Sequence, residues 1–555
     1  MTQEEARSRL GWLDPRGRWT WTFDGPAMGV LALVVFAVEL PRLSHYFYTV
    51  DSVLFSLAVD RYDVWSLRPH PPGYPVYVFL GGFFARAAGD YNRGFAILSV
   101  VFAASSVALL YGFLREWLSG VIAFATALLF SAAPVLRFDG ALALTYTAEA
   151  AASVGLAWLA WRARERPTLA TAAVLGAVLS LATGVRQSVG LFLAPVAAYG
   201  LLTPPWDLRT HLRRWGAAVA SGLMVTLAWF VPAVALTGGL SRWAQATRFQ
   251  TREVVFADAV WNRGAVAWDE HAWRLGYFLR AERSHLLPLL LILLLLLGAA
   301  AVARRVRPPS PLPRGVPAFL LAWTLPSLAF YLVVFDGWDR GPLGYALVFL
   351  PAVYALVGWL ASAAWAALPL PDVRALHRWG AVGLAFVLLT PLPALHQDAE
   401  RLRLDEIVAH DEWARGWDKI RAAYPPNETA ILVWYSWAHV KWYFEDYLTW
   451  VYFPSYDVRG EDPWILVWQM QHREDERPFT EAYLSGPQGD PPHPIPSTIR
   501  TVVVFDFQLA GENGAQRRID PAVNVSEAWA QDWRLLVFHP DASRPAIEDY
   551  LVFER

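Results

Sequence analysis

The apolar residues of this chain are gathered into long blocks, and this feature limits its fold more than any other. A block of about 17 to 25 apolar residues is long enough to cross a bilayer as a helix. From Pro26 to Leu395 the blocks are roughly 16 to 24 residues long, whereas Gln397 to Arg555 has the mixed composition of a water-soluble domain. Apolar residues make up 55% and charged residues 17% of the 555 residues, which does not fit a soluble multidomain protein. We therefore expect a polytopic α-helical membrane protein.

Three parts of the chain differ in composition. The polar residues 1–25 are predicted to be a cytoplasmic tail, residues 26–395 a transmembrane domain, and residues 396–555 a soluble extracytoplasmic α/β domain. The first apolar block is too long for a cleaved signal peptide, so it is interpreted as the first transmembrane helix. In the soluble part a helix is expected at Ala438–Leu448. Strands are predicted at the β-branched and aromatic runs Ala430–Tyr435, Thr501–Phe507, Arg534–Phe538 and Tyr550–Phe553.

Charge and cysteine content exclude several functions. The formal net charge is −2, which gives no overall attraction for nucleic acid. The chain has no cysteine, so disulfides, thiolate metal sites and cysteine nucleophiles are excluded. The part predicted to lie outside the cell must therefore be stabilised by packing alone.

Eleven apolar blocks are predicted to cross the membrane. They lie near residues 26–44, 94–114, 119–136, 144–161, 168–183, 188–203, 215–237, 286–303, 317–335, 341–364 and 378–395. A further block, Pro72–Ala88, is predicted to be half-inserted or juxtamembrane, because counting it as a crossing would scatter the arginine-rich loops over both faces. Without that crossing, every loop on the side of the N-terminus carries arginine, as short cytoplasmic loops do. The N-terminus is therefore predicted inside, and the C-terminal domain outside together with loops 41–93 and 237–285.

The first predicted outer loop contains the most informative motif. Asp51 follows the first predicted helix, and the element His70-Pro71-Pro72-Gly73-Tyr74-Pro75 comes shortly afterwards. Further segments of the same pattern are Asn92–Ser99, Arg137–Asp139, Tyr146–Glu149, Gly184–Ser188 and Gly344-Tyr345. Together they resemble the GT-C superfamily of membrane glycosyltransferases, in particular protein O-mannosyltransferases and their bacterial relatives. The resemblance covers about residues 26–395, with one difference at Ser52, where O-mannosyltransferases carry a second acidic residue.

The resemblance implies transfer of a sugar from a polyprenyl-phosphate carrier to an extracytoplasmic protein, lipid or polysaccharide, with inversion at the anomeric carbon. A hydroxyl acceptor is a poor nucleophile, so a carboxylate must take its proton as the new bond forms, which contributes roughly 10² to 10⁴ in rate. Asp51 is the first candidate for this base, and Asp139 and Glu149 are the other candidate catalytic carboxylates. The alternative for Asp51 is that it only caps a helix beginning at Ser52, since aspartate is a preferred N-cap residue.

Arginines on the predicted outer side run against the charge bias and call for an explanation. The guanidinium of Arg186 or Arg340 suits the lipid-linked phosphate, although Arg340 could instead pair with Asp336 or Asp339. His70, held by two prolines, could bind phosphate, the acceptor or a metal, or could simply be solvated. The predicted substrate-binding residues are His70, Tyr74, Arg186, Gln187 and Arg340.

The metal requirement and one rival function stay open. Asp51 with Asp139 or Glu149 could hold a divalent cation, but pairs of carboxylates are common in proteins without metals. Glu149 lies inside a predicted helix, where a carboxylate is costly, so a partner or a cavity is expected beside it. The rival is a transporter or flippase of lipid-linked saccharide, which would place polar groups near the bilayer midplane. Here the ionisable residues gather at one face, which favours the enzyme.

Overall fold

The computed structural model describes most of the helical part of the chain and part of the C-terminal region. The described residues are 21–203, 207–252, 272, 290, 294, 315–333, 343–367, 374–403, 407, 409–433, 436–454, 464–470, 497–505, 534–538 and 550–554. They form two compact units that are each assembled from separated segments. The first, called the helical unit, comprises Met1–Leu43, Tyr74–Ala233 and Gln250–Asp405. The second, called the mixed unit, comprises Ser44–Gly73, Val234–Phe249 and Glu406–Arg555.

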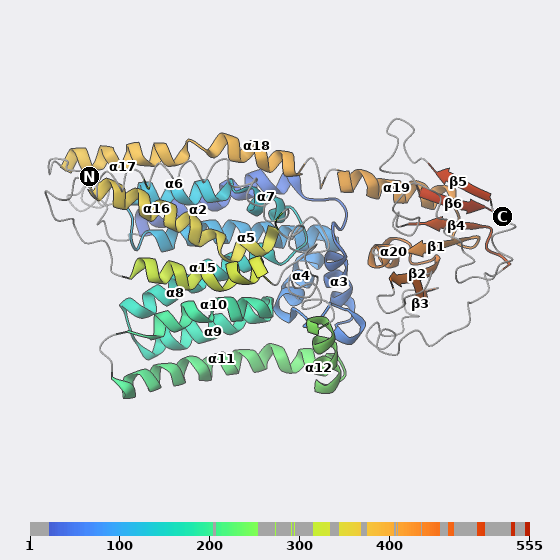
Figure 1. The fold of residues 1–555 in the computed structure, drawn as a ribbon, viewed down its shortest axis with the longest axis horizontal. Coiled ribbons are helices and arrows are strands. Elements are labelled where there is room, and N and C mark those ends of the chain that lie inside the picture. Colours follow the sequence, from blue (N-terminus) through green and yellow to red (C-terminus); the bar gives the residue numbers. More distant parts are fainter. Residues whose placement is uncertain are drawn as a thin grey trace. The chain divides into compact units, whose positions relative to one another are not determined.

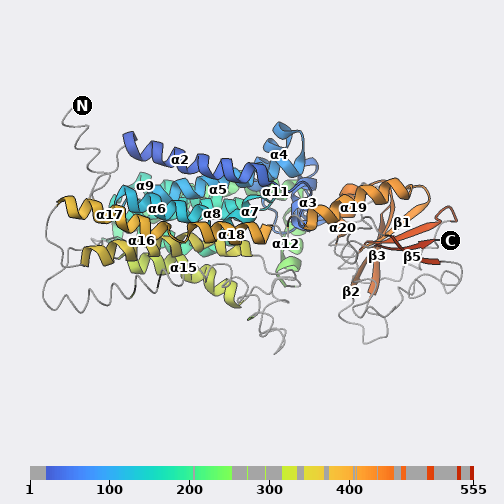
Figure 2. The ribbon, with the colours of Figure 1, turned by 90° about the horizontal axis from the view of Figure 1, so that it is seen from above.

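The helical unit is a bundle of apolar helices, most of which run side by side with roughly parallel axes (Figures 1 and 2). Its helices are α2 (Trp21–Glu39), η1 (Leu40–Arg42), α4 (Pro75–Ala88), α5 (Tyr91–Leu114), α6 (Gly120–Ser131), α7 (Pro134–Gly140), α8 (Tyr146–Glu165), α9 (Leu169–Val185), α10 (Gln187–Leu201), α11 (Leu208–Leu236, whose last residues belong to the mixed unit), α15 (Val316–Val333), η5 (Leu343–Val348), α16 (Leu350–Ala367), α17 (Arg374–Leu389) and α18 (Leu392–Arg403). Helix α5 packs against α2, α4 and α8, and α8 also packs against α9 and α10. These contacts make α5 and α8 the centre of the bundle.

The helices have the composition of membrane spans. Among the described residues, three helices are long and apolar enough to cross a bilayer: Thr22–Arg42, Tyr91–Leu114 and Leu208–Leu236. The pair α6 and α7, bent by 59°, makes a fourth if it is counted as one span. Helix α11 has only 6% of its apolar window buried inside the protein, as expected of a helix that faces lipid. The protein is thus a membrane protein, while the predicted number of about eleven crossings is not confirmed, and the predicted block 286–303 lies almost entirely outside the described residues.

The block predicted to be half-inserted or juxtamembrane is the short helix α4. It begins after Tyr74, whose φ of 51° lies in the left-handed region, and it has 14 residues. Its inner face is fitted closely to α5, because a Cβ atom at Gly81 would lie 1.8 Å from the ring of Phe95. Its other face exposes Phe79 (77%) and Phe83 (65%). Helix α4 is therefore packed on one side and apolar on the other, as a helix that touches lipid would be.

The mixed unit contains a six-stranded sheet with the strand order β3-β2-β1-β4-β6-β5. The strands are β1 (Thr429–Val433), β2 (Leu448–Pro454), β3 (Trp464–Met470), β4 (Thr501–Val504), β5 (Arg534–Phe538) and β6 (Tyr550–Glu554). The helices of this unit are α3 (Val50–Asp60), η2 (Val64–Ser66), α12 (Leu240–Phe249), α19 (Ala409–Ala423) and α20 (Trp437–Tyr443). Strand β1 is parallel to both of its neighbours and buried along its whole length, as its continuous apolar sequence favours. The helix expected at Ala438–Leu448 ends at Tyr443, because Leu448 already begins β2.

Two histidines lie next to each other in the mixed unit, His439 buried and His410 half-buried. The ring centroids of His410 and His439 lie 6.1 Å apart. Burial, reinforced by the neighbouring His439, lowers the pKa of His410 to about 3. Burial lowers the pKa of His439 to about 4, although its Nε2 lies 3.0 Å from the carbonyl oxygen of Phe47. Both side chains are therefore neutral in the folded unit at physiological pH.

These histidines predict a loss of stability in mild acid. Above the ordinary pKa of 6.5 both the folded and the unfolded chain carry neutral imidazoles, so these histidines do not lower the free energy of unfolding there. As the pH falls below 6.5 the unfolded chain binds more protons than the folded chain. Each histidine then lowers the free energy of unfolding by up to about 1.4 kcal/mol per pH unit. We expect denaturant unfolding of the full chain in detergent to show this loss between about pH 7.5 and 5.5. The double variant His410→Gln/His439→Gln should lose less stability over the same interval, and an equal loss would contradict the assignment.

Candidate functional site

Arg186 is held in the helical unit at the junction of two helices. It is the residue between α9 and α10, in extended conformation, and it is 8% exposed. The backbone before it is closely packed, because a Cβ atom at Gly184 would lie 2.6 Å from the side chain of Val76 in α4. The guanidinium is therefore fixed at the place where α9 ends and α10 begins.

Glu149 is the ionic partner of Arg186. Nη1 of Arg186 donates to Oε1 of Glu149 at 2.7 Å and to the hydroxyl of Thr145 at 3.1 Å. The hydroxyl of Thr145 in turn donates to the same carboxylate oxygen at 2.9 Å. Glu149 is fully buried in the first turn of α8. The partner expected beside this carboxylate is thus Arg186, and loss of either charge would leave the other buried and unpaired.

Three tyrosines surround the guanidinium of Arg186. Its centre lies 4.2 Å from the ring centroid of Tyr345, 5.0 Å from that of Tyr146 and 5.9 Å from that of Tyr74. Nη2 also donates a hydrogen bond to the hydroxyl of Tyr345. Only glycine fits at position 344, because a Cβ atom there would lie 2.2 Å from the ring of Tyr146. Aromatic faces attract a cation at these distances and hold the guanidinium in one orientation.

Several polar atoms near Arg186 in the chain are buried without a hydrogen-bond partner among the described residues. They are Oε2 of Glu149, both side-chain polar atoms of Gln187 and the hydroxyl of Ser188. Buried polar groups in native proteins are nearly always satisfied, by protein, by water or by a ligand. These atoms therefore mark the start of α10 and the first turn of α8 as places where a polar ligand could bind. We call Thr145, Glu149, Arg186, Gln187 and Tyr345 the arginine site.

Asp51 and His70 lie together in the mixed unit. Nδ1 of His70 is 3.4 Å from Oδ1 of Asp51, and the exposed fractions of the two side chains are 12% and 45%. Asp51 does not cap its helix, which corrects the alternative interpretation of the sequence. Helix α3 begins at Val50, one residue before Asp51, and its N-cap is Thr49, whose hydroxyl accepts from the backbone N–H of Ser52 at 3.3 Å. Asp51 is therefore a half-exposed carboxylate in the first turn of α3.

The remaining predicted residues are less informative. Asp139 is 2% exposed in α7 and makes contacts of its own. Arg340 lies outside the described residues. Within the part of the chain that the structure describes, no group of three or more histidine, cysteine, aspartate or glutamate side chains could hold a metal ion.

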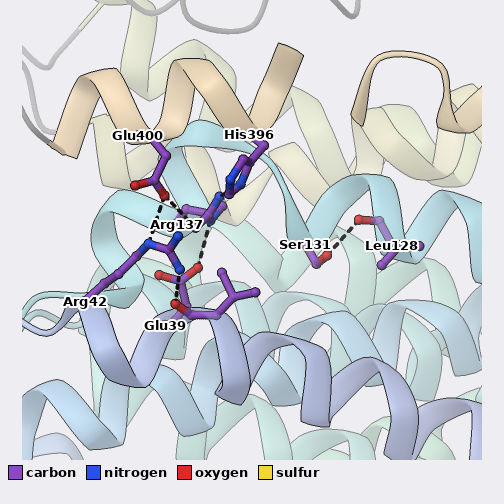
Figure 3. Close-up of polar contacts among 8 residues, drawn as sticks. Glu39, Arg42, Leu128, Ser131, Arg137, His396 and Glu400 are labelled. Carbon is purple, nitrogen blue, oxygen red and sulfur yellow. Dashed lines mark hydrogen bonds and ion pairs between the residues drawn. The ribbon is translucent and has the colours of Figure 1, made fainter. Parts of the chain in front are cut away.

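A second buried ion cluster, shown in Figure 3, was missed by the sequence analysis. Nε of Arg137 donates to Glu39 at 2.8 Å, and its Nη2 donates to Glu400 at 3.0 Å. Arg42 also contacts Glu400, at 2.9 Å, and Nη1 of Arg137 contacts the ring of His396. The cluster ties α7 to α2 and to α18. Arg137 could have been found, because it lies on the predicted outer side and runs against the same charge bias as Arg186.

The bundle of apolar helices, with a buried Arg–Glu pair at the start of its central helix α8, defines a polytopic membrane protein. Residues 69–235 match the family model described as dolichyl-phosphate-mannose-protein mannosyltransferase. The crystal structure of ArnT from Cupriavidus metallidurans bound to undecaprenyl phosphate matches with a TM-score of 0.52 at 14% identity, over 95% of this chain and 97% of that chain. The apo structure of the same protein matches with a TM-score of 0.51 at 14% identity, over 95% and 96% of the two chains. These findings confirm the resemblance to GT-C membrane glycosyltransferases.

More distant structures add little. Arabinosyltransferase EmbB from Mycobacterium smegmatis is 16% identical over 76% of this chain and 45% of that chain, with a TM-score of 0.41. A likeness of that size does not establish a common fold. A search of curated proteins finds no match to the chain.

Proposed function

We propose that the protein is an inverting glycosyltransferase that moves a sugar from a polyprenyl-phosphate carrier to an extracytoplasmic acceptor. The observation that carries this proposal is the arginine site, in which a buried guanidinium is accompanied by polar atoms that have no hydrogen-bond partner among the described residues. Support comes from the fold shared with ArnT, whose structure holds undecaprenyl phosphate, and from the mannosyltransferase family model. The acceptor is a protein, a lipid or a polysaccharide.

In this proposal Arg186 binds the phosphate of the donor. A guanidinium has five N–H donors, and Glu149, Thr145 and Tyr345 engage only some of them. As far as the described residues show, the others are left for a phosphate oxygen, whose negative charge grows as the sugar leaves. Glu149 and the tyrosines then act by fixing the orientation of Arg186. The amide of Gln187 has no hydrogen-bond partner in the described part of the chain, and in this proposal it is a second donor to the same anion. The ring of Tyr74 lies 5.9 Å from the guanidinium.

Asp51 is the proposed base for the acceptor. Its carboxylate is half exposed, so an acceptor hydroxyl can reach it, and its contact with His70 restricts its orientation. A base placed in this way contributes roughly 10² to 10⁴ in rate. Asp139 and Glu149 are the alternative carboxylates if Asp51 is dispensable.

The proposal is tested with purified protein in detergent and synthetic polyprenyl-phosphate sugars. An enzyme releases free polyprenyl phosphate when an acceptor is present, because the bond between C1 of the sugar and the phosphate oxygen breaks as the bond to the acceptor forms. Movement of intact donor across vesicles, with no release of polyprenyl phosphate, would instead identify a flippase. If the protein neither releases polyprenyl phosphate nor moves intact donor, with any of the donor sugars tested, both the glycosyltransferase and the flippase are refuted.

We also propose that the N-terminus is cytoplasmic and that the C-terminal domain, residues 396–555, is extracytoplasmic. The argument is the excess of arginine in the loops on the side of the N-terminus. A reporter enzyme that is active only outside the cytoplasm should therefore be active when fused after Arg555 and inactive when fused after Arg307. The opposite pair of results would reverse the orientation and move the proposed site to the cytoplasmic side.

A further inference from the structure

The segment that leads into α3 is bound by one buried carboxylate from α19. Asp411, which is 5% exposed, accepts hydrogen bonds from the hydroxyl of Ser44 at 3.0 Å, from the backbone N–H of His45 at 3.1 Å and from the backbone N–H of Tyr46 at 3.3 Å. The ring of His45 also lies 3.3 Å from this carboxylate. We call this arrangement, Asp411 with Ser44, His45 and Tyr46, the Asp411 clamp. It joins residues that are about 366 positions apart in the sequence.

The next residue is held from both sides. The backbone N–H of Phe47 donates to the hydroxyl of Tyr443 at 3.1 Å. The carbonyl oxygen of Phe47 lies 3.0 Å from Nε2 of His439. Because a carbonyl oxygen can only accept, this nitrogen of His439 is the protonated one. The chain from Ser44 to Phe47 is thus bonded at every residue to the segment from Asp411 to Tyr443.

The fixed segment ends at Phe47, four positions before the candidate base Asp51. Thr49 caps α3, and Asp51 is the second residue of that helix. Helix α3 also packs against α20, which carries His439 and Tyr443. The segment before α3 is thus bonded to α19 and α20, and α3 itself packs against α20; both α19 and α20 come from the C-terminal part of the chain.

We propose that Asp411 is a positioning residue for sugar transfer, and that the C-terminal domain serves to place Asp51 through the Asp411 clamp. This inference rests on the proposed function. A carboxylate is needed because it presents only acceptors to three donors at once. Asparagine has nearly the same size, but its amide N–H₂ would face a backbone N–H and leave that donor unsatisfied. A base displaced by about 1 Å loses much of its effect, because proton transfer requires close approach.

The test compares two aspartates of the same helix. Asp411→Asn should lower the turnover number for sugar transfer roughly 10- to 100-fold at saturating donor, with little change in the KM for the lipid donor. The matched control is Asp418→Asn, since Asp418 is exposed on α19 and only reaches the hydroxyl of Tyr46 at 3.4 Å. Its turnover should stay within about twofold of wild type, as for other surface contacts. Ser44→Ala removes one of the three bonds and should give a smaller loss in the same direction.

A merely structural role predicts a different pattern. If Asp411 acts through Asp51, then adding Asp411→Asn to Asp51→Asn causes no further loss, because the positioned base is already gone. Additive losses, or wild-type turnover in folded Asp411→Asn protein, would overturn the positioning role.

Hydrogen exchange separates this inference from the proposed function. The amides of His45 and Tyr46 should exchange faster in Asp411→Asn than in Asp418→Asn, whether or not the protein transfers sugar. Unchanged exchange would refute the clamp. Absence of transfer by the wild-type chain would refute the proposed function and the positioning role of Asp411 with it, while faster exchange would still establish the clamp.

Discussion

Asp51→Asn is expected to give a folded protein that still binds the lipid donor but transfers sugar roughly 10² to 10⁴ times more slowly. The substitution keeps the size of the side chain and removes its ability to accept the proton of the acceptor. The helix should survive, because its cap is the hydroxyl of Thr49. The measurement is the rate of transfer at saturating donor, together with the melting temperature and the affinity for polyprenyl phosphate.

Two control variants separate chemistry from helix stability. Thr49→Ala removes the cap and should lower the free energy of unfolding by about 1 kcal/mol, with a much smaller effect on the rate of transfer than Asp51→Asn. Asp60→Asn changes an exposed carboxylate at the other end of the same helix and should be near normal. If Asp51→Asn transfers sugar at the wild-type rate, the base is elsewhere, and Asp139 and Glu149 become the residues to test.

Arg186→Lys is expected to lower kcat/KM for the lipid donor by about 10²-fold, although the positive charge is kept. Lysine cannot bind Glu149, Tyr345 and a phosphate oxygen at once in the planar geometry of a guanidinium. The ion pair with Glu149 is buried, so this position is sensitive to a change of side-chain shape. An ammonium group displaced from the place of the guanidinium would leave the buried carboxylate without a close positive charge. The measurement is initial-rate kinetics with varied polyprenyl-phosphate sugar.

The matched control is another buried arginine in the helical unit. Arg115 pairs with Asp24 at 2.7 Å, and both side chains are almost completely buried. Arg115→Lys should therefore lower the melting temperature as much as Arg186→Lys does, without a specific loss of donor affinity. Equal losses of kcat/KM in the two variants would mean that Arg186 has only a structural role.

The amino-acid sequence alone predicted a membrane protein and singled out Asp51, His70 and Arg186 as candidate site residues. The length of the apolar blocks predicted a membrane protein, because only a helix or a closed barrel satisfies backbone polar groups in lipid. The motif around Asp51 and His70 pointed to membrane glycosyltransferases, and the resemblance is confirmed by the family model and the fold. Arg186 was found because an outer arginine is unusual. These signals are local, so they can be read from the order of residues.

Tertiary structure decided which residues act on one another. Arg186 meets Glu149 across 37 positions, and Asp411 meets His45 across 366. No sequence pattern specifies such pairs, because they depend on which helices pack side by side. The alternative that Asp51 caps α3 could not be settled from the sequence for a related reason: Thr49 and Asp51 are both good caps, and only the backbone conformation shows that the helix begins at Val50. Local chemistry thus determined the kind of protein, while packing between distant segments determined the partners of its buried charges.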